Sequence, residues 1–231
     1  MKLVLLPGMD GTGHLFELFV QALPPALTAQ IVSYPVNQCL GYEALTELVR
    51  SELPKDEPFA LLGESFSGPI AVRIAAEQPA GLAAIVLCCS FVRNPSRLLS
   101  LFQPLISVVP FHLKISHLIG AHLLGIGSNA VLRRMIVRAV DEVNSDVLRF
   151  RLREIHSVDV SNLMARITVP ILYLGGTQDT LVPASCANEV LDLASDAEIV
   201  DLAAPHMLLQ VAPEPAAREM SQFIARRLGV Q

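Results

Sequence analysis

Short apolar runs alternate with longer helical patterns along most of this chain, and the alternation constrains the fold more than any other feature. The runs predict strands at residues 2–6, 30–34, 58–62, 83–89, 169–174 and 197–201. Most of these runs are almost continuously apolar, which is typical of strands buried on both faces. Helical patterns occupy residues 14–23, 41–53, 66–78, 184–194 and 214–228. The alternation predicts an α/β fold: a mostly or wholly parallel sheet of about six strands with helices on both faces.

One long segment interrupts this alternation. Residues 91–167 contain no good strand and show helical stretches at 95–107, 112–124, 129–141 and 144–156. A helical insertion between two strands of a parallel sheet is the simplest interpretation. We therefore expect residues 1–90 and 168–231 to form the core and residues 91–167 to form a helical cap.

Length and composition exclude several classes of protein. A chain of 231 residues buries roughly 70–75% of its unfolded surface, so it needs no disulfide or metal to fold. A net charge of −5 argues against nucleic-acid binding. No apolar run approaches the roughly 20 residues of a membrane span, and the apolar stretch at residues 3–6 is too short for a signal peptide. We expect a cytoplasmic protein whose free thiols are buried, without metal-binding or secreted spacing: Cys39, Cys88, Cys89 and Cys186.

The predicted strand at residues 58–62 leads directly into the sequence GESFSG at residues 63–68, and a helix follows. This is the strand–turn–helix context of a nucleophile elbow, in which a tight turn lifts a serine hydroxyl clear of the sheet. Ser65 is therefore the predicted nucleophile. A Gly/Ser-rich loop without a catalytic role is the alternative interpretation of the motif.

The elbow departs from the usual G-x-S-x-G pattern, because Ser67 stands where the second glycine is expected. Since serine is small, we expect slight crowding at this position rather than loss of the turn. Pro69 would be the fourth residue of a helix that begins at Phe66. A proline costs little there, because the first four helical N–H groups have no partner within the helix.

A serine nucleophile needs a general base, and the base needs an acid that orients it. In the chain order Ser, Asp or Glu, His, the acid follows the strand at 169–174, where Asp179 is the only carboxylate in the loop. His206 is the only histidine after it. All three residues follow the carboxyl ends of predicted strands, where active sites of open α/β sheets lie. A turn-capping Asp179, a surface His206 and Asp201 as the acid are the alternatives.

A tetrahedral intermediate also needs backbone donors for its negative oxygen. We expect the N–H of Phe66, at a helix N-terminus, and the N–H of Met9, in the loop after the first strand. Asp10 and His14 belong to the same region and are candidates for substrate contacts or for plain loop and capping roles. The glycines of this loop do not fit a dinucleotide or phosphate-binding motif, so we predict no nucleotide. Acyl transfer by a serine, a histidine and an aspartate needs no metal or organic cofactor, so we predict neither.

Taken together and in this order, the motifs resemble those of the α/β-hydrolase superfamily. The resemblance covers nearly the whole chain and rests on LPGMDGTG at 6–13, GESFSG at 63–68, ITVPILYLG at 167–175, and Pro205-His206 before a last helix. Members usually carry a helical cap between two strands, as residues 91–167 suggest. They typically have two further strands before the oxyanion loop, so we expect this fold without the first two strands.

The resemblance implies acyl transfer through an acyl-enzyme on Ser65, with a small-molecule ester or thioester as substrate. The apolar cap predicts a hydrophobic pocket and a serine carboxylesterase for short- to medium-chain esters. Arginines in the cap predict either a solvated helix face or docking of an acidic acyl carrier or CoA: Arg133, Arg134, Arg138, Arg149, Arg151 and Arg153. A thioesterase, or an esterase or acyltransferase for carrier-linked esters, is therefore the alternative enzyme. A non-catalytic ligand-binding protein of the same fold is the alternative of another class.

Overall fold

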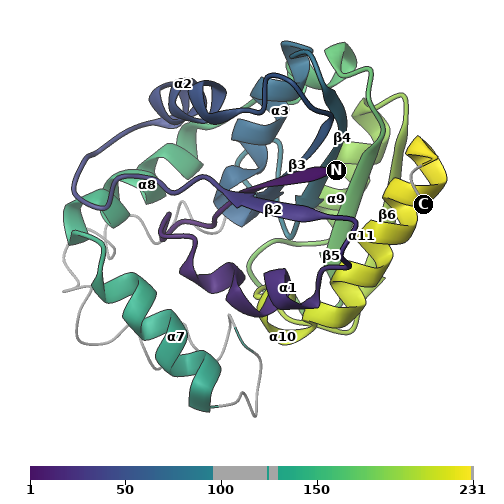
Figure 1. Ribbon diagram of the computed structural model, residues 1–231. Helices are drawn as coiled ribbons and strands as arrows, with labels where there is room; N and C mark the ends of the chain where they lie inside the picture. The colour runs from purple at the N-terminus through teal and green to yellow at the C-terminus, as the bar shows by residue number, and fades with distance from the viewer. Residues whose placement is uncertain (96–123, 125–129, 230–231) are drawn as a thin grey trace.

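One parallel sheet forms the centre of the computed structural model, which describes residues 1–95, 124 and 130–229 (Figure 1). Its strands are β1 (Lys2–Leu6), β2 (Thr28–Ile31), β3 (Phe59–Glu64), β4 (Leu82–Cys88), β5 (Ile171–Gly176) and β6 (Ala197–Leu202). The six strands of the described residues have the order β2-β1-β3-β4-β5-β6, and every neighbouring pair is parallel. The predicted six-stranded, wholly parallel sheet is confirmed.

Helices cover both faces of the sheet. The helices of the core are α1 (Glu17–Ala22), α2 (Tyr42–Glu52), α3 (Gly68–Ala76), α9 (Ser185–Leu193), α10 (Leu208–Val211) and α11 (Pro213–Leu228). The described helices of the insertion are α7 (Ala130–Asp141) and α8 (Ser145–Ser157). Short 3-10 helices are η1 (His14–Phe16), η2 (Ser65–Ser67) and η3 (Ser161–Arg166). Alternate strand residues serve opposite faces: Val4 packs in one cluster with α2, α3 and α9, whereas Leu5 packs in the other with α1, α10 and α11.

The strand order places two loops side by side at one edge of the sheet. The chain runs from β1 outward to β2, then crosses back to β3 on the other side of β1. The loops that follow β1 and β3 therefore leave neighbouring strands in opposite directions, which opens a crevice at this switch point. These are the oxyanion loop (residues 7–13) and the elbow predicted from the sequence.

The helix after the elbow starts later than predicted. The chain first forms the 3-10 turn η2, and the α-helix begins at Gly68, so Pro69 is its second residue rather than its fourth. The turn is needed because Ser65 has a positive φ angle, from which an α-helix cannot start directly. Pro69 still lies where its missing N–H would have no helical partner.

The second strand also ends earlier than predicted, at Ile31. After Ile31 the chain runs beside the oxyanion loop, where the Tyr34 N–H donates to the Gly11 carbonyl at 2.7 Å. The expectation of buried cysteines is wrong for Cys39, which is exposed in the turn before α2, whereas Cys88, Cys89 and Cys186 are buried. Among the residues described here, no helix is long and apolar enough to cross a membrane.

The insertion is described only in part. The predicted helices 95–107 and 112–124 lie outside the described residues, apart from Pro95 and Leu124, whereas α7 and α8 occupy the other two predicted positions. Helix α7 packs on η1 through a small cluster that contains Leu15, Ala139 and Met207. At both ends of the insertion, Val92 and Val160 join the core cluster of the sheet. The extent of a separate cap remains a prediction.

Candidate active site

Ser65 lies on a strained turn directly after β3. Its φ angle is 48°, in the left-handed region that non-glycine residues rarely adopt, and such strain clusters at functional sites. Two close approaches shape the turn. A Cβ on Gly63 would lie 2.7 Å from the Ser67 carbonyl oxygen, and a Cβ on Gly68 would lie 1.8 Å from Ser90 Oγ. Glycine is therefore required at positions 63 and 68, and position 67 has room for a side chain.

The Ser67 side chain, which replaces the usual glycine, is fully buried and has two partners. Its hydroxyl donates to the Pro7 carbonyl, and Tyr34 Oη lies 2.7 Å from Ser67 Oγ. Because the serine proton is used toward Pro7, the tyrosine hydroxyl is the donor of the second bond. Ser67 thus connects the elbow to the first residue of the oxyanion loop.

The structure brings Ser65, His206 and Asp179 together in one hydrogen-bonded chain. Ser65 Oγ lies 2.9 Å from His206 Nε2, and His206 Nδ1 lies 2.7 Å from Asp179 Oδ2. The side chains of His206 and Asp179 are 7% and 3% exposed. The loops after β3, β5 and β6 supply the three residues, all at the carboxyl edge of the sheet.

The surroundings of Asp179 favour its ionised form. Burial alone would raise its pKa, but the hydrogen bond and charge of His206, with the backbone N–H groups of Val182 and Leu181, bring the pKa below its usual value. The two N–H groups donate to Asp179 Oδ1 at 2.9 and 2.8 Å. An ionised carboxylate only accepts hydrogen bonds, so His206 Nδ1 carries the proton. His206 Nε2 is then free to accept the proton of Ser65.

Asp201, the alternative acid, is exposed at the end of β6. The His206 ring bonds to Asp179 instead, which favours Asp179 as the residue that orients the imidazole. Asp179 also caps its own loop through its second oxygen, so the capping role and the role toward His206 coexist in one carboxylate.

The predicted oxyanion donors lie in the two loops of the switch point. Phe66 follows Ser65 in η2, and its ring stacks on Tyr42 with centroids 4.7 Å apart. Met9 lies in the oxyanion loop, where the Gly11 N–H donates to the Gly8 carbonyl at 3.0 Å. In a trans peptide the N–H points opposite to the carbonyl, so this bond directs the Met9 N–H away from the loop interior.

The two candidates for substrate contacts have other partners in the structure. Asp10 is buried, and its Oδ2 accepts hydrogen bonds from the Thr12 N–H at 2.9 Å and the Thr12 hydroxyl at 2.6 Å. His14 is exposed, and its Nε2 lies 3.0 Å from Glu142 Oε2 on the α7 side. A role in substrate binding stays a prediction for both residues.

Sequence analysis did not single out several buried polar residues around the site. Ser90 follows β4 and donates to the Ser65 carbonyl at 2.5 Å, which stabilises the strained turn. The Glu64 carboxylate accepts a hydrogen bond from Gln210 Nε2 at 3.0 Å. Burial raises the pKa of Glu64 to about 7, although Gln210, His206 and the Gly8 N–H oppose the shift. Only Ser90 was foreseeable, as a polar residue at the carboxyl end of a buried strand.

The arginine set of the insertion divides into two parts. Arg133, Arg134, Arg138 and Arg153 are exposed and Arg149 is half-buried, as a solvated face predicts. Arg151 contradicts both interpretations, since it is completely buried and contacts neither solvent nor a surface. The periodicity of a helix separates its faces but does not tell a buried arginine from an exposed one, because the side chain is long and amphipathic.

Potential metal ligands gather once among the described residues. One ligand atom each from Cys89, Asp179 and His206 lie within 4.8 Å of one another. Both ring nitrogens of His206 already have partners, Ser65 and Asp179, so a metal ion at this place would have to displace one of them. This arrangement fits proton transfer better than metal binding.

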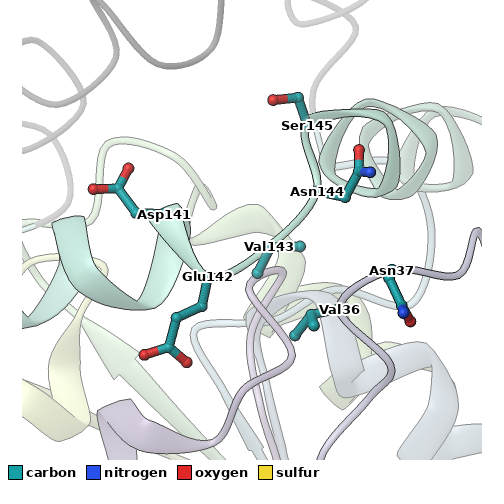
Figure 2. A pocket seen from close by; sticks show the side chains of 7 residues that line it. All are labelled: Val36, Asn37, Asp141, Glu142, Val143, Asn144 and Ser145. Atoms are coloured by element: carbon teal, nitrogen blue, oxygen red, sulfur yellow. The ribbon is translucent and has the colours of Figure 1, made fainter.

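A hollow of about 400 Å³ lies beside the oxyanion loop, between the segment Val36–Asn37 and the connection from α7 to α8 (Figure 2). The Asn144 N–H donates to the Val36 carbonyl at 2.9 Å and ties the two sides together. Val36 and Val143 pack in a cluster that Met9 also contacts. The hollow therefore lies where the connection from α7 to α8 meets the segment that follows β2.

Comparison with known families gives a match that contains the whole hydrogen-bonded chain. A model of the family described as serine aminopeptidase, S33, matches residues 41–207, a range that includes Ser65, Asp179 and His206. The chain is also similar to phytyl ester synthase 1, chloroplastic, of Arabidopsis thaliana, with 31% identity over 117 residues. That match covers 47% of this chain and 16% of the relative, so the chain spans a small part of the relative's length.

Solved structures share the fold over nearly the full length of the chain. An esterase from Exiguobacterium antarcticum is 13% identical with a TM-score of 0.81, and 97% of this chain and 91% of that chain are covered. An enol-lactonase from Burkholderia xenovorans LB400 is 17% identical with a TM-score of 0.82 and the same coverage, 97% and 91%. An alpha/beta hydrolase enzyme from a Medee basin deep-sea metagenome library is 16% identical with a TM-score of 0.78, covering 97% and 89%.

Proposed function

The chain belongs to the serine aminopeptidase S33 family, a hydrolase family of the α/β-hydrolase superfamily, and from this premise we propose that it is a serine carboxylesterase. One observation carries the proposal: the continuous hydrogen-bonded chain from Ser65 Oγ through His206 to Asp179. Such a chain turns a weakly nucleophilic hydroxyl into an effective one.

Each group of the site has a distinct task in the proposed reaction. Ser65 Oγ attacks the ester carbonyl while His206 Nε2 takes its proton, and Asp179 stabilises the charged imidazole. The N–H groups of Phe66 and Met9 hold the oxyanion of the tetrahedral intermediate. His206 then returns the proton to the leaving alcohol. Water, deprotonated by the same imidazole, releases the acid from Ser65.

Apolar residues beside the imidazole support an ester with a hydrophobic acyl group. Met207 follows His206 in the chain and packs with Leu15 and α7 in the small cluster of the insertion. Apolar walls of this kind bind acyl chains by excluding water from them. A preference for short to medium chains is part of the proposal, and the apolar residues behind that prediction lie mostly outside the described residues.

The proposal is tested with p-nitrophenyl esters of increasing chain length and a fluorophosphonate probe. We expect labelling and turnover in the wild type, with both lost in Ser65→Ala. Ser51→Ala, at an exposed hydroxyl on α2, is the matched control and should keep both. A wild type that is neither labelled by the probe nor active on any of these esters would favour the alternative of a non-catalytic ligand-binding protein.

Acyl transfer to an alcohol is a second candidate, favoured by the similarity to a protein named phytyl ester synthase. In this reaction an alcohol replaces water as the acceptor of the Ser65-bound acyl group, and the same groups of the site act. The test is the product ratio: with a long-chain alcohol present, a transferase yields the new ester at the expense of the free acid. A ratio that follows only the concentration of the alcohol relative to water favours simple hydrolysis.

Carrier-linked thioesters are a further candidate substrate, proposed from the exposed arginines of α7. Charge reversal at Arg133 and Arg134 tests this candidate, because docking of an acidic carrier depends on exposed positive charge. Loss of carrier-linked turnover, with p-nitrophenyl ester hydrolysis unchanged, would support docking. Carrier-linked turnover that stays at the wild-type level in the variant would dismiss it.

A further inference from the structure

Arg151 is the largest of the fully buried side chains in the described part of the molecule. It extends from α8 of the insertion to the backbone of the oxyanion loop. Its Nη1 donates to the carbonyls of Met9 and Asp10, each at 2.9 Å, and its Nη2 donates to the carbonyl of Pro35 at 2.9 Å. The guanidinium also lies 5.7 Å from the centre of the Tyr34 ring.

No carboxylate of a described residue forms an ion pair with this buried guanidinium. Burial lowers its pKa, and its Nε has no hydrogen-bond partner among the described residues. The cost of removing a charge from water offsets much of what its hydrogen bonds contribute, so a buried charge is weak evidence for a role in stability alone. We therefore consider what the three carbonyl contacts of the arginine do for the loop.

The bonds of Arg151 fall on the peptide groups that flank the predicted oxyanion donor. The Met9 carbonyl, next to the Met9 N–H along the chain, accepts from Arg151, as does the Asp10 carbonyl. On the other side, the Pro7 carbonyl accepts from Ser67. The Gly8 carbonyl, which belongs to the same peptide group as the Met9 N–H, accepts from the Gly11 N–H. The donor peptide is thus fixed at both neighbours and at its own carbonyl.

We propose that Arg151 is a positioning residue that orients the Met9 N–H for the oxyanion, so that formation of the oxyanion hole depends on docking of the insertion. The inference rests on the proposed function. Arg151 does not touch the substrate, and it acts through the loop backbone. The guanidinium donates from two separate nitrogens to three carbonyls, whereas a lysine has a single nitrogen on a differently shaped side chain and does not reproduce this fork.

The surroundings of Arg151 are shaped to receive it. A Cβ on Gly11 would lie 2.5 Å from Arg151 Nη1, so glycine gives the guanidinium access to the loop. One turn further along α8, Glu154 Oε2 accepts from the Tyr42 N–H at 3.0 Å, at the first residue of α2. The two charged residues face the core from one side of α8 and dock this helix on the loop and on α2.

Kinetics of Arg151→Lys and Arg151→Ala provide the first test, with Arg153→Ala on the exposed side of the same helix as the control. We expect kcat for a p-nitrophenyl ester to fall by about 10- to 100-fold in both Arg151 variants, less than or equal to the loss of an oxyanion donor. KM should change by less than about threefold, because the loop donor acts mainly in the transition state. Added guanidinium ion should restore part of the kcat of Arg151→Ala and leave Arg153→Ala unchanged.

The Met9 N–H provides a second test that does not depend on turnover. The chain has 6 methionines, so protein labelled with ¹⁵N-methionine gives a simple amide spectrum in which Met9→Leu identifies the Met9 signal. We expect one sharp Met9 signal in the wild type and in Arg153→Ala. It should broaden or split in Arg151→Lys and Arg151→Ala, and the signal of Arg151→Ala should sharpen again when guanidinium is added.

The outcomes separate this inference from the proposed function. A folded Arg151→Lys or Arg151→Ala with wild-type kcat and an unchanged Met9 signal overturns the positioning role. A kcat that falls only in step with a loss of folded protein, without rescue by guanidinium, also overturns it. If the wild type itself shows neither labelling nor turnover, the proposed function fails, and the Met9 signal alone then decides whether Arg151 orders the loop.

Discussion

The elbow and the oxyanion loop meet at the same crevice, yet they are held in different ways. The elbow is specified mostly within a short stretch: Gly63 permits the close approach of the Ser67 backbone, and β3 and α3 fix its two ends. The oxyanion loop takes its bonds from distant parts of the chain, from Ser67 and from Arg151, which is 142 positions from Met9. The nucleophile is encoded locally, and its oxyanion donor is encoded by the tertiary fold.

This difference indicates which part of the site can change its conformation without loss of the fold. A strained local turn has one conformation or is lost, because neighbouring backbone atoms enforce it. A loop fixed by side chains from a separate helix can be ordered or released when that helix docks or leaves. Substitutions at the elbow and its catalytic partners should therefore have different effects from substitutions at the contacts that hold the oxyanion loop.

The largest effect is expected on the elbow side of the crevice, where Asp179 orients the base that acts on Ser65. In Asp179→Asn, the amide disfavours the imidazole tautomer that accepts from Ser65, so kcat should fall by about 10⁴-fold, equivalent to roughly 5.5 kcal/mol. Steady-state kinetics on a p-nitrophenyl ester measure the change. Asp201→Asn, at the exposed carboxylate near the end of β6, is the control. Similar losses in both variants would contradict the assignment of Asp179.

The meeting of Ser65, Asp179 and His206 could be predicted from the sequence for a physical reason. The order of buried strands and helices requires a parallel sheet, and residues that follow strand ends must then gather at one edge. Ser65, Asp179 and His206 each follow such a strand, so their meeting needed no knowledge of side-chain packing. The 3-10 turn before α3 was missed, because a positive φ at Ser65 leaves no trace in residue types.

The bonds that hold the oxyanion loop could not be predicted from the sequence. Arg151 stood among six arginines of the insertion, and nothing in the helical pattern distinguished it from exposed neighbours. The role of Ser67 was also missed, since the motif suggested only a crowded substitute for glycine. In both cases the partner is a backbone carbonyl, and every residue offers one, so no residue type marks the acceptor.

The next largest effect is expected at Glu64, between the elbow and α10. Burial raises its pKa to about 7, so between about pH 4.5 and 7 the folded protein binds more protons than the unfolded chain. Stability from this group is full below pH 4.5 and is lost as the pH rises through 7. As the pH rises across that range, the wild type should therefore lose up to about 3 kcal/mol of unfolding free energy relative to Glu64→Gln.

Urea unfolding at several pH values measures this difference. Glu52→Gln, at an exposed glutamate of α2, controls for the change in net charge. A difference between wild type and Glu64→Gln that stays constant from pH 4.5 to pH 8 would show that the pKa of Glu64 is the same in the folded protein as in the unfolded chain.

A smaller effect is expected at Ser67, where the two sides of the crevice are joined. Ser67→Gly restores the usual elbow pattern but removes the donor to the Pro7 carbonyl and the acceptor for Tyr34. The cost of such a lost buried bond is about 1–2 kcal/mol, so kcat should fall by about 5- to 30-fold with little change in KM. Tyr34→Phe should cost less, because it leaves the bond to Pro7. Faster turnover in Ser67→Gly would show that this serine only crowds the elbow.

The smallest effect is expected at the surface contact between η1 and α7. His14 Nε2 and Glu142 Oε2 are 3.0 Å apart, but their side chains are 64% and 37% exposed, and exposed pairs contribute below about 1 kcal/mol. Glu142→Gln should therefore change kcat and the free energy of unfolding only slightly, and any change should vanish at high salt. Enzyme kinetics and urea unfolding at low and high ionic strength measure it. A loss of kcat as large as that of Arg151→Ala would mean that docking of the insertion depends on this surface contact as much as on the buried arginine.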